Sequence, residues 1–183
     1  MRIAASREVA LRDNLGLVLM LSLLWLSPAR ASELSQVPTA LAPGFDLPDL
    51  AGRPRSLSEF EGKVVLVTFW ASWCRPCIEE MPSIRRLADA MADAPFAVVG
   101  VNVGEGERRV QSAARRLGIT FPVLLDRNSA TFKAWSADVL PTAYVLDAGG
   151  KVRYLARGPL EWDRTDIIER LRRLAAEEAP RAE

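Results

Sequence analysis

The sequence of 183 residues contains no histidine and only two cysteines, Cys74 and Cys77. A structural zinc site takes four cysteine, histidine or carboxylate ligands, so two cysteines without any histidine argue against a structural zinc site. The missing histidine also excludes a cysteine nucleophile activated by histidine, as in cysteine proteases. Charges nearly balance, with a formal net charge of +1, so no nucleic-acid partner is predicted. These absences leave the two thiols as the main candidates for chemistry.

The N-terminus has the layout of a secretory signal. Arginines at positions 2, 7 and 12 precede an apolar run over residues 15–26, and the triplet at 29–31 is Ala-Arg-Ala. A charged segment, a short apolar segment and a small-residue cleavage site are typical of exported chains. The run is also shorter than the roughly 20 residues of a membrane span. We predict a signal peptide over residues 1–31, or alternatively an uncleaved membrane anchor, and an extracytoplasmic location, in the bacterial periplasm.

The rest of the chain is predicted to form one domain. Residues 32–43 lack periodicity and are predicted to be a linker. Residues 44–176 are predicted to fold, and residues 177–183 to form a fraying tail. The composition, with 49% hydrophobic and 26% charged residues, is that of an ordinary soluble domain.

Strands and helices alternate along this predicted domain. Residues 63–70 are apolar and β-branched almost throughout, as in a strand buried on both faces of a sheet. Apolar residues at helical spacing follow the cysteines, so a helix is expected to start there. The alternation predicts an α/β fold with a central mixed β-sheet flanked by helices. Further strands are expected over residues 96–103 and 121–126, an N-terminal hairpin over 45–60, a second hairpin around 148–150, and helices over 107–118 and 166–177.

Three interpretations are open for two cysteines at this spacing: a copper site, an inert disulfide and a redox-active dithiol. Copper sites usually add a histidine or methionine, and the nearby thioether of Met81 is predicted to face the core. Residues i and i+3 on a helix lie about 5–6 Å apart, within reach of a disulfide. A disulfide that closes so small a loop adds little stability to the fold, because the stabilisation by a disulfide grows with the length of the loop that it closes. A helix N-terminus would instead stabilise a thiolate on Cys74, and Pro76 is tolerated in that first turn, so the redox pair is favoured.

Two stretches resemble the thioredoxin-like proteins. FWASWCRPC (Phe69–Cys77) matches the W-C-x-P-C form of their active-site motif, and LPTAYVLDAGGKV (Leu140–Val152) resembles the region of their cis-proline and final hairpin. Residues 98–126 lie between them, as the extra strand and helix do in the TlpA/ResA-like group of secreted thiol-disulfide oxidoreductases. The resemblance implies a thioredoxin-like fold with an N-terminal β-hairpin and a central βα insertion, and no cofactor beyond the Cys74–Cys77 disulfide.

The same resemblance implies roles for five residues. Cys74 would be the exposed attacking thiolate, and Cys77, one turn deeper, would resolve the mixed disulfide. Trp73 would form part of the docking surface, although a tryptophan packed beside the motif fits the sequence as well. Pro141 resembles the cis-proline next to the disulfide, which lets Leu140 offer its backbone to an extended substrate.

Resolution of the mixed disulfide requires removal of the Cys77 proton. Thioredoxin uses a buried carboxylate near the end of the central strand, where this chain has Thr68, which cannot titrate. Glu80 lies three residues beyond Cys77 on the same helix face, and ResA-like members carry a glutamate there. We therefore predict that Glu80 handles the proton, whereas Glu79 is predicted to face solvent.

Three residues are predicted to tune the redox couple. Glu105 matches another acidic position near the site in the family. Arg75 and Pro76 stand between the cysteines, and the Arg75 guanidinium would favour the thiolate, where some ResA-like proteins have an acidic residue. A more stable reduced form makes the couple less reducing, while Glu80 acts in the opposite direction, so the sequence leaves the potential open.

The favoured function is an exported thiol-disulfide oxidoreductase that reduces selected protein disulfides. The resemblance implies apocytochrome c or copper-site proteins as substrates and a membrane thiol carrier as the source of electrons. A disulfide-forming oxidant and, less favoured, a copper-binding chaperone remain as alternatives. A peroxidase of the peroxiredoxin type is disfavoured, because the Pro-x-x-x-Thr/Ser-x-x-Cys surround is absent before Cys74.

Overall fold

The computed structural model describes residues 33–177. The predicted signal segment over residues 1–31 lies outside this range, as does the end of the predicted tail, residues 178–183. Between residues 33 and 177, none of the helices combines the length and the apolar character needed to cross a membrane.

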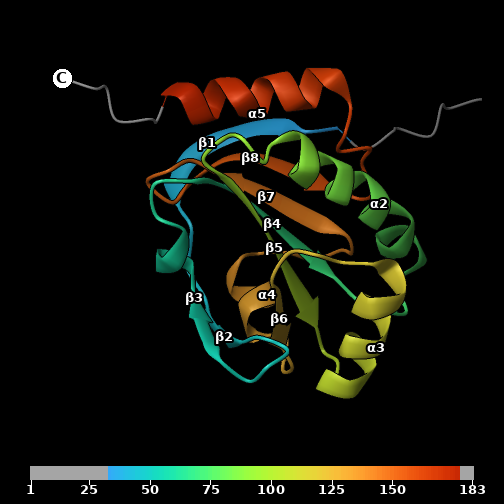
Figure 1. The fold of residues 1–183 in the computed structure, drawn as a ribbon. Coiled ribbons are helices and arrows are strands. Elements are labelled where there is room, and N and C mark those ends of the chain that lie inside the picture. Colours follow the sequence, from blue (N-terminus) through green and yellow to red (C-terminus); the bar gives the residue numbers. More distant parts are fainter. Residues whose placement is uncertain (1–32, 178–183) are drawn as a thin grey trace, which may run out of the picture. The chain divides into compact units, whose positions relative to one another are not determined.

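A six-stranded mixed sheet forms the centre of this domain (Figure 1). Three neighbouring strands run parallel, β4 with β5 and β5 with β6, and the remaining pairs are antiparallel. The predicted α/β fold with a mixed central sheet is therefore confirmed. In spatial order the strands are β1 (Ser35–Leu41), β8 (Lys151–Arg157), β7 (Thr142–Leu146), β4 (Val64–Trp70), β5 (Phe96–Val103) and β6 (Val123–Asp126).

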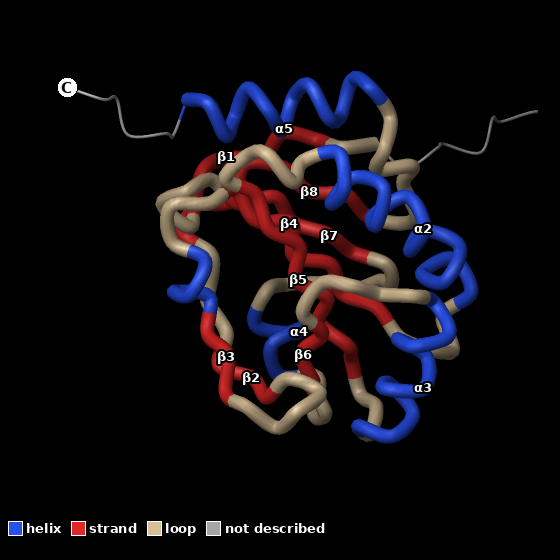
Figure 2. The backbone as a smooth tube through the Cα atoms, viewed as in Figure 1, coloured by secondary structure: helices blue, strands red, loops and turns tan. Residues whose placement is uncertain are grey.

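Helices and loops cover both faces of the sheet (Figure 2). All seven residues of β4 are buried, which explains the uninterrupted apolar run. One face packs against α2, α3 and α5, and the other against α4, η2 and a cluster of aromatic rings around Phe69 and Trp135. The helices are α2 (Arg75–Ala90), α3 (Glu107–Leu117), α4 (Ala130–Ala134), α5 (Thr165–Glu177) and the 3-10 helix η2 (Leu57–Phe60).

The predicted N-terminal hairpin is present as a separate two-stranded sheet of β2 (Asp46–Pro48) and β3 (Pro54–Ser56). Its turn is held by Asp49, whose carboxylate accepts hydrogen bonds from the backbone of Ala51 and Arg53. An isolated bridge between Asp49 and Leu124 attaches this hairpin to β6. The predicted insertion over residues 98–126 holds most of β5 together with α3 and β6.

The prediction of a linker over residues 32–43 is wrong, because residues 35–41 form the edge strand β1, antiparallel to β8. Almost every side chain of this strand faces solvent, so its sequence lacks the alternation that marks a half-buried strand. Pro38 lies within it, where the pairing register shifts between Gln36 and Ala40. An edge strand tolerates a proline because one side of the strand needs no partner. The folded domain thus begins before residue 44, and α5 reaches Glu177, one residue beyond the predicted end.

Candidate active site

The two cysteines form a disulfide at the start of α2. Cys74 is the N-cap residue, with its Sγ accepting a hydrogen bond from the Cys77 N–H at 3.3 Å, and the two Cα atoms are 5.3 Å apart. The helix therefore begins at the cysteines, as predicted. Cys74 keeps 5% of its surface exposed and Cys77 none. Attack from outside can therefore reach only Cys74, although this residue is less exposed than predicted.

The loop that carries Trp73 and Cys74 is held by Glu105, which is almost fully buried. Its carboxylate accepts hydrogen bonds from the N–H and the Oγ of Ser72, both at 2.6 Å, and from the Asn102 amide at 2.8 Å. Burial alone would raise the pKa of Glu105, but the hydrogen bonds from Asn102 and Ser72 lower it overall. Glu105 thus lies near the site as predicted, as an ionised anchor for the loop that precedes Cys74.

Replacing Glu105 with alanine is expected to reduce the free energy of unfolding by about 3 kcal/mol, because it leaves buried donors of Ser72 and Asn102 without an acceptor. Because the pKa of Glu105 is lower in the folded state than in the unfolded state, the carboxylate stabilises the fold at pH values above its unfolded-state pKa. This stabilisation is lost as the pH falls through the folded-state pKa. The difference in the free energy of unfolding between the variant and the unmodified protein should therefore become smaller below about pH 4. Urea unfolding at several pH values measures this difference. The exposed Glu107, paired with Arg127, supplies the control, and its alanine variant should lose less than about 1 kcal/mol.

A groove of about 610 Å³ lies beside Cys74. Trp73 and Val139 stand on its rim with 66% and 45% of their surfaces exposed, and Phe132 and Leu140 add apolar lining. The exposure of Trp73 fits the docking interpretation and not the packed alternative. The groove has the size and the apolar lining to receive a segment of a polypeptide next to the disulfide.

The peptide bond between Leu140 and Pro141 is cis. Pro141 is buried directly before β7, and its carbonyl accepts a hydrogen bond from the Gly158 N–H at 2.8 Å. Leu140 lines the groove, and within residues 33–177 its N–H and C=O make no hydrogen bond. These backbone groups are available to an extended chain in the groove.

Glu80 is buried on α2, with 4% of its surface exposed. Its Oε1 accepts a hydrogen bond from the indole N–H of Trp162, and its Oε2 has no partner within the described residues. Desolvation raises the pKa of Glu80 to about 8, against the lowering effect of the Trp162 bond, and the negative charge of Glu161 adds to the rise. A carboxyl group with such a pKa exchanges its proton near neutral pH, which suits a proton acceptor for a thiol.

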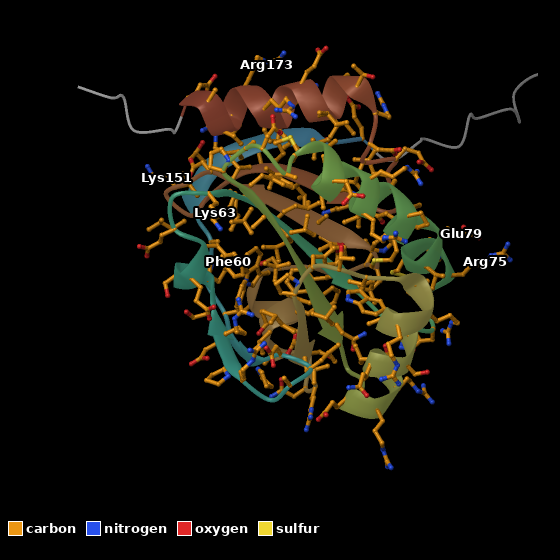
Figure 3. The ribbon with its side chains drawn as sticks, in the orientation of Figure 1. Phe60, Lys63, Arg75, Glu79, Lys151 and Arg173 are labelled. Atoms are coloured by element: carbon orange, nitrogen blue, oxygen red, sulfur yellow. A yellow bond between two sulfur atoms is a disulfide. The ribbon has the colours of Figure 1, made fainter. Side chains whose placement is uncertain are left out.

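Arg75 and Glu79 lie on the surface at the start of α2, where Figure 3 shows both side chains directed outward. The Arg75 Nε donates to Glu79 Oε1 at 2.8 Å, and both side chains are mostly exposed. Because solvent and Glu79 both screen the guanidinium, its stabilisation of a Cys74 thiolate is smaller than the sequence suggests. Pro76 occupies the first turn of α2. Glu79 faces solvent, as predicted.

Four residues contact the site residues without being predicted from the sequence, namely Ser72, Ser83, Asn102 and Trp162. Asn102 was the most detectable, because it is a polar residue in an otherwise apolar buried strand. Trp162 lies in the loop between β8 and α5, and nothing in the local sequence connects it to α2. Thr68, in the place of the thioredoxin acid, is fully buried and its Oγ1 has no partner in the described part of the chain.

The arrangement supports exchange between Cys74 and an external disulfide, with Cys77 enclosed and the buried carboxyl group of Glu80 three residues beyond it on α2. Within residues 33–177 no group of three or more histidine, cysteine or acidic side chains could hold a metal ion. The redox centre of the site is the cysteine pair itself.

Comparison with known proteins gives a consistent result. Residues 38–155 match the model of the AhpC/TSA family. The thiol-disulfide oxidoreductase ResA of Geobacillus thermodenitrificans is 38% identical over 119 residues, which are 65% of this chain and 68% of that protein. The thioredoxin-like protein YneN of Bacillus subtilis is 38% identical over 124 residues, covering 65% and 71% of the two chains. A solved thiol:disulfide interchange protein of the thioredoxin family from Chlorobium tepidum superposes with a TM-score of 0.64 at 28% identity, over 75% of this chain and 99% of that one.

Proposed function

Because the chain belongs to the AhpC/TSA family and is a thiol-disulfide oxidoreductase of the ResA type, we propose that it reduces selected protein disulfides outside the cytoplasm. The observation that carries the proposal is the difference between the two sulfur atoms. Cys74 opens into an apolar groove beside the cis-proline, whereas Cys77 is completely enclosed. Such a pair acts on a bound polypeptide through one thiol and finishes the exchange internally.

The reaction proceeds in two exchanges. The Cys74 thiolate attacks one sulfur of the substrate disulfide, and the other substrate sulfur leaves as a thiolate that takes up a proton. Cys77 gives its proton to Glu80 and attacks the Cys74 sulfur, which forms the Cys74–Cys77 disulfide and releases the second substrate thiol. The substrate gains two electrons and the protein loses them. We propose a membrane thiol carrier as the donor that restores the dithiol.

The direction of electron flow gives a test that separates reductant from oxidant. We expect the Cys74–Cys77 couple to be more reducing than the glutathione pool, with a potential below about −260 mV. The disulfide should then persist in glutathione buffers poised at about −260 mV, as measured by thiol alkylation at equilibrium. A protein that becomes reduced in these buffers would be an oxidant instead. Arg75→Ala is the control, and because its ion pair is exposed we expect a shift smaller than about 30 mV.

We further propose export through residues 1–31 and substrates among apocytochromes c or copper-site proteins. The groove supports a polypeptide substrate, since Trp73 and Val139 offer exposed apolar surface beside the reacting sulfur. Tight copper binding by the reduced protein without any disulfide reduction would favour a copper chaperone instead.

A further inference from the structure

Trp162 contacts the catalytic helix from the loop between β8 and α5, which covers residues 158–164. It is fully buried, and its indole N–H donates to the carboxylate of Glu80, 82 residues away in the sequence. The N–H of a buried tryptophan usually finds a hydrogen-bond acceptor, and that acceptor is here the only acid buried in α2. The contact therefore joins a structural side chain to a titratable one.

A second set of contacts fixes the backbone of the same loop. The Trp162 N–H donates to the Ser83 Oγ at 3.2 Å, and this hydroxyl lies 2.8 Å from the Glu80 carbonyl and 3.3 Å from the Leu160 carbonyl. Outside this buried contact, Arg86 pairs with Asp163 at 2.5 Å and lies 4.0 Å from Glu161. The loop is thus attached to α2 by residues on either side of Trp162 in the sequence as well as by the Trp162 backbone.

We infer that Trp162 is a positioning residue for the exchange reaction, which holds the Glu80 carboxylate through its indole N–H while the Cys77 proton is transferred. The inference rests on the proposed proton role of Glu80. Only one carboxylate oxygen is held in the described structure, and Oε2 is left without a partner for the incoming proton.

The groups around Glu80 determine in which direction its pKa would change if the Trp162 hydrogen bond were lost. The negative charge of Glu161 raises the pKa of Glu80. Next to Glu161, Asp163 forms an ion pair with Arg86 at the surface. The side chains of strand β4 and the other buried side chains of α2 are uncharged, and among them only the cysteine thiols can lose a proton. The Trp162 hydrogen bond lowers the pKa of Glu80, so its loss would keep the carboxyl protonated to higher pH.

The test is the pH dependence of the Cys77 step in the reduced full chain. A symmetric aromatic disulfide that releases a coloured thiolate gives one release on Cys74 attack and a second when Cys77 resolves the adduct. Trp162→Phe keeps the ring and removes the N–H. We expect the midpoint of the second phase to move up by about one pH unit, which slows this phase about tenfold near pH 7. An unchanged midpoint would overturn the inference.

Two further variants separate positioning from general damage to the fold. Trp135 is also buried and donates its indole N–H, but to the Gly44 carbonyl in the opposite core cluster, so Trp135→Phe should leave the midpoint unchanged. In a Glu80→Gln background, Trp162→Phe should cause no additional shift. A shift that persists there contradicts the inference, because it does not pass through Glu80.

Ser83→Ala provides an independent measurement if Trp162→Phe does not fold. It removes the hydroxyl that holds the Trp162 backbone, and we expect a smaller upward shift with the indole retained. No shift in a folded Ser83→Ala protein would then count against the inference. Failure of the first release in the unmodified protein would instead contradict the proposed oxidoreductase role of Cys74, so the two failures are distinguishable.

Discussion

Replacing Cys77 with serine is expected to leave Cys74 covalently joined to its substrate. The enclosed Cys77 is the only other thiol of the chain and the one placed to attack the mixed disulfide. Resolution within one molecule has an effective concentration far above that of any free thiol, often ~10⁵ M or more. Turnover should therefore fall by at least about a thousandfold while the first exchange continues.

The trapped adduct identifies the substrate as well as the mechanism. Proteins that co-purify with Cys77→Ser and separate from it only after reduction are the partners, and mass spectrometry identifies them. Cys74→Ser is the matched control, because Cys77 is enclosed and should form no adduct. If Cys77→Ser captures no protein while the unmodified enzyme reduces disulfides, the assignment of attacking and resolving thiols is wrong.

The buried elements of the fold were predictable, whereas the exposed edge was not. Strand β4 is covered on both faces, so every position selects an apolar or β-branched residue and the run is visible in the sequence. Strand β1 is held mainly by backbone pairing with β8, and backbone hydrogen bonds impose no side-chain pattern. Pro38 adds a residue that normally indicates a loop. The same difference explains why the helix at Cys74 was found and the domain start was not.

The site divides in a similar way between local and distant contacts. Cys74 is the N-cap residue of α2, and Cys77 and Glu80 follow at intervals of three residues, so the spacing and the family resemblance together predicted their grouping. Trp162 reaches Glu80 from a loop 82 residues away, and only the folded chain brings the two into contact. Residues that adjust a titratable group through tertiary packing leave no periodic signal in a single sequence.

Replacing Glu80 with glutamine is expected to slow disulfide reduction by about a hundredfold and to remove the titration near pH 8 from the rate profile. Glutamine keeps the shape of the side chain and can still accept the Trp162 hydrogen bond, but it cannot take the Cys77 proton. Single-turnover rates of the dithiol between pH 5 and pH 10, roughly the range that spans the carboxyl and thiol titrations, measure the change.

The stability of the same variant gives a second, independent reading of the buried carboxyl. The folded pKa of Glu80 lies above its unfolded value, so its protonated form stabilises the folded protein at low pH and this stability is lost as the pH rises through about 8. Glu80→Gln should therefore unfold less readily than the unmodified protein at high pH and show a flatter dependence on pH. Glu79→Gln is the matched control one residue away, because that side chain is exposed and paired with Arg75. If Glu79→Gln and Glu80→Gln give the same rate and stability profiles, Glu80 has no special role, since burial is what distinguishes the two carboxylates.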